Sequence, residues 1–375
     1  MSNSSSDVII VGGGVIGCSI AYYLAKNGVK SIVFEEGQFA SGASGATAGM
    51  ITPLWHVDHT NEDLFDMGIS SLLAYPHLVS ELLDFGTNPE FHQSGVLKLA
   101  LTTEEVDILT SDLVWQRSLN MGVEWLNPSE IMDQEPEITP RILGGVFSPT
   151  EGHITGKRLV NSLVHAATKL GAVFFEGVEV TELLINKQKV TGVRTAKGCF
   201  YTDNTILATG PWTGLTNRWI PGSLPIRPVK GQRFTIKKPG FILNSVVHSF
   251  KGTSLPQANG DILIGATREE SKFDSNITVD AITEVLLNAH HIFPGLSDAI
   301  FVDSFAGVRP GSPDNMPVLG PIPGWSGISI ASGHDWAGVM LAPSTGEMMA
   351  TYIQSGDSSH LGTFLIDRFY DDPVR

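Results

Sequence analysis

The segment DVIIVGGGVIGCSIAYYLAKNGVKSIVFEE, at positions 7–36, constrains the fold more than any other part of the chain. It predicts a strand, a tight turn, a helix and a second strand, which open a parallel sheet. In the turn, Gly12, Gly14 and Gly17 give the spacing G-x-G-x-x-G directly after an apolar strand. The first two glycines permit a close approach of a pyrophosphate to backbone N–H groups, and the third lets the helix pack on the strand.

A carboxylate ends the second predicted strand, because Glu35 lies 23 residues after Gly12. At this place it accepts hydrogen bonds from the adenosine ribose and disfavours the 2′-phosphate of NADP. No second G-x-G-x-x-G follows a strand elsewhere in the chain, so electrons are not expected to arrive from NAD(P)H through a second Rossmann unit. Two cofactors remain open, a flavin that takes electrons from a substrate bound beside it, and NAD.

The rest of the chain predicts a second, different sheet. Helical patterns cover about 61–85 and 103–122. Alternating runs at about 172–209 predict a meander or hairpin inserted after the first unit, and strand-like runs at about 223–267 predict the second sheet. The segment GISIASG at 327–333 returns to a strand followed by a helix. Because 375 residues exceed one small core, two domains are expected. The predicted fold class is α/β, a Rossmann-like domain with a second domain built on a mainly antiparallel sheet.

Several classes of protein are disfavoured. A net charge of −15 argues against a nucleic-acid partner, which requires clustered cations. Cys18 and Cys199 form no Cys-x-x-Cys pair, and no apolar run reaches the length of a membrane span. A cytoplasmic location is therefore expected, with peripheral membrane contact left open. His56, Asp58 and His59 lack zinc-motif spacing, so no metal site is predicted. No G-x-S-x-G or phosphate-binding loop of nucleotide triphosphatases occurs.

One cation has no obvious partner in the sequence. AGVRPGSPDNMPVLG, at 306–320, places Arg309 among glycines, prolines and apolar residues. A poorly hydrated guanidinium is costly unless an anion accompanies it. That anion is either a nearby carboxylate of the protein, Asp303 or Asp314, or the anionic group of a ligand.

Six segments together carry a resemblance to a known family. They are IIVGGGVIGCSIAYYLAKNG, SGATAGM, TILATGPW, ILIGAT, GVRPGSPDNMPVLG and ASGHDWAGVMLAPSTGEMMA, spread from end to end of the chain. In this order they resemble the glycine oxidase-like members of the D-amino acid oxidase superfamily of FAD-dependent amine oxidoreductases. The resemblance implies a discontinuous FAD-binding domain from residues 1–82, 145–222 and 301–375. It implies a substrate domain from residues 83–144 and 223–300.

The resemblance also implies which residues surround the FAD, which is expected to be noncovalent. Beyond the turn glycines and Glu35, these are Val15, Ile16, Glu36, Ala43, Ser44, Ala48, Gly49, Met50, Val180, Gly210, Gly333, His334, Asp335, Trp336, Ala337, Gly338, Val339 and Met340. The last of these segments is expected to run under the flavin ring, where backbone N–H groups stabilise negative charge.

On the substrate side, the resemblance places Arg309 where the family binds the substrate carboxylate, with Met50 also beside the substrate. A bidentate guanidinium fixes the orientation of a carboxylate as well as its charge. The chain departs from the family at three places. Thr253 stands where a tyrosine helps to bind the carboxylate, and Trp336 stands where a second arginine is found. Arg268 stands where an apolar residue lies near the substrate.

These departures predict a substrate larger than glycine. Alternation along the strand places Lys251 on the same face as Thr253, and Arg268 could receive a second anionic group of the substrate. The alternative is that Lys251 and Arg268 are solvated charges at strand ends.

The implied reaction is oxidative deamination of a small amino acid or secondary amine acid, similar to glycine or sarcosine. Hydride leaves the α-carbon for flavin N5, and the imine hydrolyses to an oxo acid, with dioxygen or another acceptor reoxidising the flavin. Two alternatives stay open: a dye- or quinone-linked dehydrogenase of a D-amino acid, proline or an N-carboxymethyl amino acid, and a noncatalytic flavin-binding subunit. Homo-oligomerisation is compatible with each.

Overall fold

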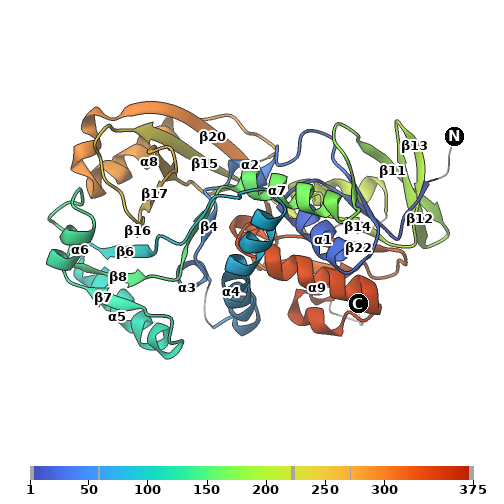
Figure 1. The fold of residues 1–375 in the computed structure, drawn as a ribbon, viewed down its shortest axis with the longest axis horizontal. Coiled ribbons are helices and arrows are strands. Elements are labelled where there is room, and N and C mark those ends of the chain that lie inside the picture. Colours follow the sequence, from blue (N-terminus) through green and yellow to red (C-terminus); the bar gives the residue numbers. More distant parts are fainter. Residues whose placement is uncertain (1–3, 58–59, 221–223, 271, 371–375) are drawn as a thin grey trace.

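The computed structural model describes residues 4–57, 60–220, 224–270 and 272–370. Two bodies of sheet lie side by side along the long axis (Figure 1). One contains the N-terminal elements and the last helix, and the other contains a large sheet with orange and teal segments around it. The mixture of parallel and antiparallel sheets confirms the predicted α/β class.

The predicted strand–helix–strand unit is formed by β2 (Val8–Val11), α1 (Val15–Lys26) and β3 (Ser31–Phe34). It belongs to a six-stranded sheet in the order β10-β3-β2-β14-β22-β21, in which only β21 runs antiparallel to its neighbour. The other strands of this sheet are β10 (Val173–Phe175), β14 (Thr205–Leu207), β21 (Val318–Pro321) and β22 (Ile328–Ser332).

Both faces of this sheet are covered, which explains why β2 is apolar at every position. Val8 and Ile10 pack in a core with α1, α7 (Gly156–Lys169) and α9 (Ala342–Ser355). Ile9 and Val11 pack in a second core with a four-stranded sheet on the other face. The strands of that sheet, in spatial order, are β1 (Ser4–Ser5), β13 (Gly198–Tyr201), β12 (Lys189–Thr195) and β11 (Val180–Asn186).

A nine-stranded, mainly antiparallel sheet forms the other body, as the alternating runs predicted. Its path is β19-β15-β18-β17-β16-β6-β8-β7, and β20 pairs along β15. The strands are β6 (Val96–Ala100), β7 (Glu124–Leu126), β8 (Gly144–Ser148), β15 (Arg227–Lys237), β16 (Val246–Ser249), β17 (Gly252–Pro256), β18 (Ile262–Gly265), β19 (Glu269–Glu270) and β20 (Ile300–Gly311). One face packs on α8 (Val279–Ile292).

The predicted helices at 61–85 and 103–122 are α4 (Glu62–Asp84) and α5 (Thr103–Ser118). A capping box between Thr102 and Glu105 fixes the start of α5. The remaining elements are α2 (Ala43–Ala46), β4 (Met50–Ile51), α3 (Pro53–His56), β5 (Phe91–His92), α6 (Pro128–Gln134), β9 (Gly152–Ile154) and 3₁₀ turns at Gly210–Arg218, Pro294–Asp298, Asp335–Ala337, Ser359–Phe364 and Ile366–Phe369.

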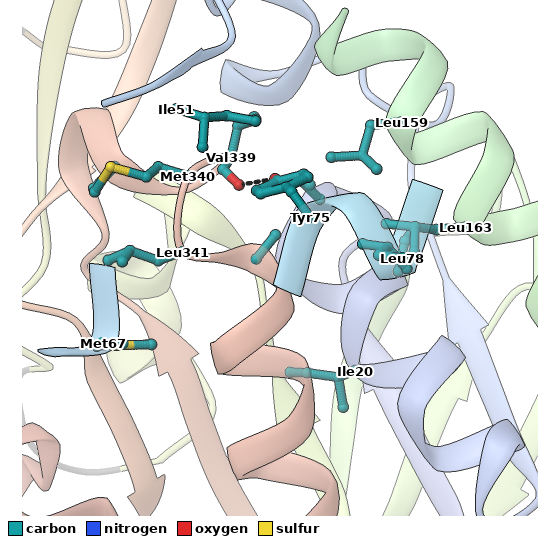
Figure 2. Close-up of a cluster of buried hydrophobic side chains, with 14 of the residues drawn as sticks. Ile20, Ile51, Met67, Tyr75, Leu78, Leu159, Leu163, Val339, Met340 and Leu341 are labelled. Atoms are coloured by element: carbon teal, nitrogen blue, oxygen red, sulfur yellow. Dashed lines mark hydrogen bonds between the residues drawn. The ribbon is translucent and has the colours of Figure 1, made fainter. Parts of the chain in front are cut away.

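Helix α4 ties the first third of the chain to its C-terminal part. The hydroxyl of Tyr75 donates a hydrogen bond to the carbonyl of Val339, and the two groups face each other in Figure 2. Tyr75 is fully buried among apolar side chains from α4, α7 and the segment before α9. One turn earlier, Ser71 Oγ lies 2.9 Å from Ser344 Oγ. The backbone around Val339 is therefore held from outside the sheet.

The predicted domain boundary at residue 300 falls at the first residue of β20. Because β20 pairs with β15 from Ile300 to Gly311, its residues belong to the large sheet rather than to the six-stranded one. The division into two domains stays a prediction, and its last border would fall after Gly311 if β20 is counted with the sheet in which it pairs.

Candidate active site

A cavity of about 780 Å³ lies where the two bodies meet. Its walls come from the turn between β2 and α1, from α2, from the turn before α9, and from six strands of the large sheet, β6, β15, β16, β17, β18 and β20. Its volume is in the range of pockets that hold cofactors and substrates.

The turn of residues 12–17, here called the glycine turn, requires glycine at two positions. Gly12 has a φ of +113°, and a Cβ there would lie 2.3 Å from the carbonyl oxygen of Ala208. A Cβ at Gly17 would lie 2.1 Å from the carbonyl oxygen of Gly12. The Val15 N–H donates to Ser44 Oγ at 2.9 Å. The turn thus brings bare backbone and the N-terminus of α1 to the cavity, as an anionic pyrophosphate requires.

Glu35 fixes the loops on each side of the glycine turn. Its Oε2 accepts from the Gly13 N–H at 2.8 Å, and its Oε1 accepts from the Gly37 N–H at 2.8 Å. Glu35 and Glu36 both line the cavity, and Val180 lies in the same lining.

The turn of residues 333–340, here called the C-terminal turn, carries two buried polar side chains. His334 Nε2 lies 3.0 Å from Thr345 Oγ1, and burial lowers the pKa of His334 to about 3, so its ring is neutral at pH 7. Asp335 has a φ of +47° and is buried. Its Oδ2 accepts from Arg268 Nη1 at 2.5 Å, whereas its Oδ1 has no hydrogen-bond partner.

Most of the sequence-predicted site residues line the cavity. They are Gly12, Gly14, Val15, Ile16, Glu35, Glu36, Ala43, Ser44, Ala48, Met50, Val180, Gly210, Lys251, Thr253, Arg268, Arg309, His334, Asp335, Trp336, Gly338 and Val339. Five others lie behind the wall and shape it: Gly17, Gly49, Gly333, Ala337 and Met340.

Arg309 reaches the cavity without a carboxylate beside it. Its Nη1 donates to the carbonyls of Lys230, at 3.3 Å, and Thr267, at 3.2 Å. Asp314 pairs instead with Arg368, at 2.7 Å, and among the described residues no carboxylate forms an ion pair with Arg309. Burial lowers the pKa of Arg309, an effect that more distant Asp335 opposes. Of the two partners that the sequence left open, a carboxylate of the protein is therefore not found within the described residues.

Arg268 has a different environment from the one expected. Its guanidinium is paired with Asp335 through Nη1, and its Nη2 donates to Asn315 Oδ1 at 3.1 Å. Because the carboxylate of Asp335 already neutralises the charge of Arg268, this guanidinium is poorly suited to bind a second anionic group of the substrate. The expectation of such a contact at Arg268 is not supported by this geometry.

Sequence reasoning missed several residues of the cavity wall that lie in or beside the large sheet. Lys98, Gly231, Arg233, His248 and Phe250 all line the cavity. Gly231 makes room for Arg309, because a Cβ there would lie 2.1 Å from Arg309 Nη2. Arg233 Nε donates to the Ala46 carbonyl at 2.7 Å, which joins the large sheet to α2. A lysine inside the apolar run GVLKLAL was a readable signal for Lys98.

Thr253 is linked to a neighbouring strand. Its Oγ1 lies 2.6 Å from His248 Nδ1, and both side chains line the cavity. This hydroxyl occupies the position at which the sequence resemblance expects a tyrosine.

Other candidates contribute little to this site. Within the described ranges no cluster of three or more metal-binding side chains occurs, and Asp58 and His59 lie outside those ranges. Cys18 and Cys199 do not line the cavity. In the part of the chain that the structure covers, no helix combines the length and hydropathy needed to cross a membrane.

Comparison with known proteins finds similarity over nearly the whole chain. The family described as "FAD dependent oxidoreductase" (DAO) matches residues 7–352. Glycine oxidase of Geobacillus kaustophilus is 31% identical over 356 residues, which cover 94% of each chain. The crystal structure of a glycine oxidase from the same species superposes with a TM-score of 0.91 at 30% identity, covering 98% of this chain and 99% of the other.

Two further solved structures share the architecture. L-proline dehydrogenase from P. horikoshii gives a TM-score of 0.89 at 26% identity, covering 98% of this chain and 99% of the other. Iminodiacetate oxidase from Chelativorans sp. BNC1 gives a TM-score of 0.85 at 26% identity, covering 93% and 95%.

Proposed function

The chain belongs to the DAO family of FAD-dependent oxidoreductases, and from that premise we propose that it oxidises a small amino acid or secondary amine acid. FAD is its cofactor, and amino acid oxidation is the activity that its glycine oxidase relatives support. The proposal adds the substrate type, similar to glycine or sarcosine, and dioxygen as the electron acceptor, with hydrogen peroxide as the product. A cytoplasmic location is part of the same prediction, and homo-oligomerisation is compatible with it.

The residues present fit the cofactor. The glycine turn offers backbone N–H groups and a helix N-terminus to the pyrophosphate, and Glu35 lies at the cavity wall for the adenosine ribose. The C-terminal turn would lie against the flavin ring, with the neutral His334 behind it. When bound, FAD supplies the acceptor for the hydride that leaves the substrate α-carbon.

The unaccompanied guanidinium of Arg309 carries the proposal. Arg309 faces the cavity, its guanidinium hydrogen bonds within the described residues go only to carbonyl oxygens, and burial has removed part of its hydration. A substrate carboxylate would complete this charge and orient the α-carbon toward the cofactor. Thr253 and Met50 line the same cavity and would border the substrate.

The protein's own part in the reaction is binding and exclusion of water. Trp336 gives the wall a large apolar side chain where the family resemblance expects an arginine. A substrate that binds as the neutral amine can release hydride, and the resulting imine is hydrolysed by water to an oxo acid and ammonia or an amine. No pair of side chains is assigned as general acid and base.

A dehydrogenase is the second candidate, because L-proline dehydrogenase shares the fold over almost the whole chain. The two candidates differ in the acceptor rather than in how the substrate is held. Turnover with dioxygen that releases hydrogen peroxide favours the oxidase, and turnover only with a dye or quinone favours the dehydrogenase.

The test is the anaerobic visible spectrum of the purified holoenzyme, before and after addition of glycine, sarcosine, proline and D-alanine. We expect at least one of them to bleach the flavin. Arg309→Leu should retain FAD but lower kcat/KM by at least about 100-fold, the usual cost of losing a buried charged contact. Arg194→Leu is the matched control, because Arg194 lies on β12 and pairs with Glu182 away from the cavity. Normal bleaching in Arg309→Leu would exclude the assigned role.

A further inference from the structure

Lys98 is a buried cation of the cavity wall that, like Arg309, forms no ion pair among the described residues. It is 9% exposed, lines the cavity, and forms no ion pair or hydrogen bond through its ammonium group among the described residues. On β6, Val96, Lys98 and Ala100 share one face, while Leu97 and Leu99 point into the core under the sheet. The strand therefore directs this lysine toward the cavity rather than toward solvent.

Two aromatic rings flank the ammonium group. Lys98 Nζ lies 4.8 Å from the centroid of Trp55 and 4.9 Å from that of Phe250. Cation–π contacts of this kind compensate part of the lost hydration, but they supply no negative charge. The site thus keeps a cation in place without neutralising it.

The buried carboxyl of Glu151 acts on Lys98 electrostatically but does not pair with it among the described residues. Glu151 is fully buried, and its Oε1 accepts from the Leu54 N–H at 2.8 Å. Burial raises the pKa of Glu151 to about 8, so most of it is protonated at neutral pH. Asp112 and Glu151 act on Lys98 only by longer-range attraction, and burial lowers the pKa of Lys98 in spite of them.

Lys98 and Arg309 stand at opposite ends of one wall. Strand pairing connects Lys98 with His248, His248 with Thr253, Thr253 with Gly265, and Gly265 with Arg233. Arg309 lies over Gly231, on the same strand as Arg233. Four steps between strands correspond to about 19 Å across the sheet, from the Lys98 backbone to the strand over which the Arg309 guanidinium lies. The long side chain of Lys98 shortens this span, and an extended molecule with an anion at each end would contact both.

We propose that Lys98 binds a second anionic group of the substrate, so that the enzyme prefers amino acids or secondary amine acids carrying a second carboxylate. This inference rests on the proposed function and names its substrate class. The second anionic group is assigned to Lys98, which has no ion pair among the described residues, and not to Arg268, which is already paired with Asp335.

The first test uses inert ligands, which report binding without turnover. The holoenzyme is titrated with the α,ω-dicarboxylates from malonate to suberate and with monocarboxylates of the same chain lengths, and the shift of the flavin spectrum is followed. We expect the best dicarboxylate to bind at least 10-fold more tightly than its monocarboxylate counterpart, with the optimum beyond malonate. In Lys98→Met this preference should disappear while monocarboxylate affinity stays unchanged. Lys169→Met, an exposed lysine of α7, is the control.

The second test uses oxidisable pairs of equal size, 2-aminoadipate and its ω-amide in both enantiomers. We expect the acid to reduce the flavin at least 10-fold faster than the amide at low concentration, and Lys98→Met to bring the ratio near one. Equal rates for acid and amide, or a preference that survives Lys98→Met, would overturn the inference even if glycine or sarcosine bleaches the flavin. If no amine of any kind bleaches the flavin, the proposed function fails instead, and the binding titration still decides whether Lys98 selects dianions.

Discussion

The two sides of the cavity are built in different ways. On the cofactor side, backbone approaches the cavity directly, and the glycine turn is packed against other backbone with no space for a side chain. On the substrate side, long side chains such as Lys98, Arg233 and Arg309 extend from the large sheet into the cavity. The first arrangement tolerates almost no substitution, whereas the second allows the substrate to change while the fold stays the same. The residues that bind the cofactor and those that can change with the substrate therefore lie in separate parts of the cavity wall.

The largest expected effect comes from Gly12→Ala, which tests whether the cofactor side is as rigid as this comparison requires. The new Cβ would meet the Ala208 carbonyl at 2.3 Å, and the φ of +113° is unfavourable for alanine. We expect protein purified without flavin absorbance and a free energy of unfolding lower by about 2–5 kcal/mol.

Gly28→Ala is the matched control for that variant. Gly28 also has a positive φ, of +76°, but nothing lies within 4 Å of the position that the methyl group of an alanine would take. Its free energy of unfolding should fall only by the backbone strain that alanine introduces, about 1–2 kcal/mol, and the protein should retain FAD. If both variants keep FAD equally, close packing of the glycine turn does not control cofactor binding.

A smaller effect is expected on the substrate side from Gly231→Ala. The new methyl group would overlap the guanidinium of Arg309, at 2.1 Å from Nη2, but that group is the end of a flexible side chain. The fold and the flavin spectrum should therefore be preserved while Arg309 is displaced. A misplacement of this size lowers kcat/KM by about 100-fold, which steady-state kinetics and anaerobic flavin reduction would measure. An unchanged kcat/KM would show that Arg309 does not need the space over Gly231.

The smallest expected effect concerns pH and separates His334, on the cofactor side, from Glu151, beside Lys98. The pKa of His334 is lowered to about 3, so the unfolded chain binds more protons below pH 6.5 and acid destabilises the fold. The pKa of Glu151 is raised to about 8, so the folded chain binds more protons above pH 4.5 and rising pH destabilises the fold. The contribution of each of these two groups to the free energy of unfolding changes by about 2 kcal/mol between pH 5 and 7.

Denaturant unfolding of the holoenzyme at pH 5, 6 and 7 with excess FAD would resolve the two contributions. Relative to the parent protein, His334→Asn should lose less stability toward pH 5, and Glu151→Gln should lose less toward pH 7. Parallel pH profiles in all three proteins would contradict these assignments.

The sequence predicted the cofactor side well because its constraints are local. The spacing of Gly12, Gly14 and Gly17 and the place of Glu35 follow from a single strand–helix–strand unit, and the structure forms this unit as β2, α1 and β3. Arg309 was found for a similar reason, since an arginine among glycines and prolines is visible without a fold.

The substrate side was predicted less well because its residues meet only through strand pairing. Lys98 and His248 are 150 positions apart and become neighbours by the register of β6 and β16. The pairing of Arg268 with Asp335 joins residues 67 positions apart. Neither register nor this contact can be read from alternation along one strand. The apolar run around Lys98 signals a buried lysine but not that it reaches the cavity, and the sequence does not show that Arg268 has a partner in Asp335.

The six-stranded sheet has a consequence for the order in which the protein is made. Strands β2 and β3 leave the ribosome first, but their sheet also requires β14 and then β22, which ends at Ser332. At about 5–20 residues per second, roughly 15–60 s pass between synthesis of β3 and of β22. During this interval the apolar strands β2 and β3 lack the strands that complete their sheet. We therefore expect nascent chains to need a chaperone or slow local collapse. Chains truncated before residue 328 should aggregate rather than bind FAD.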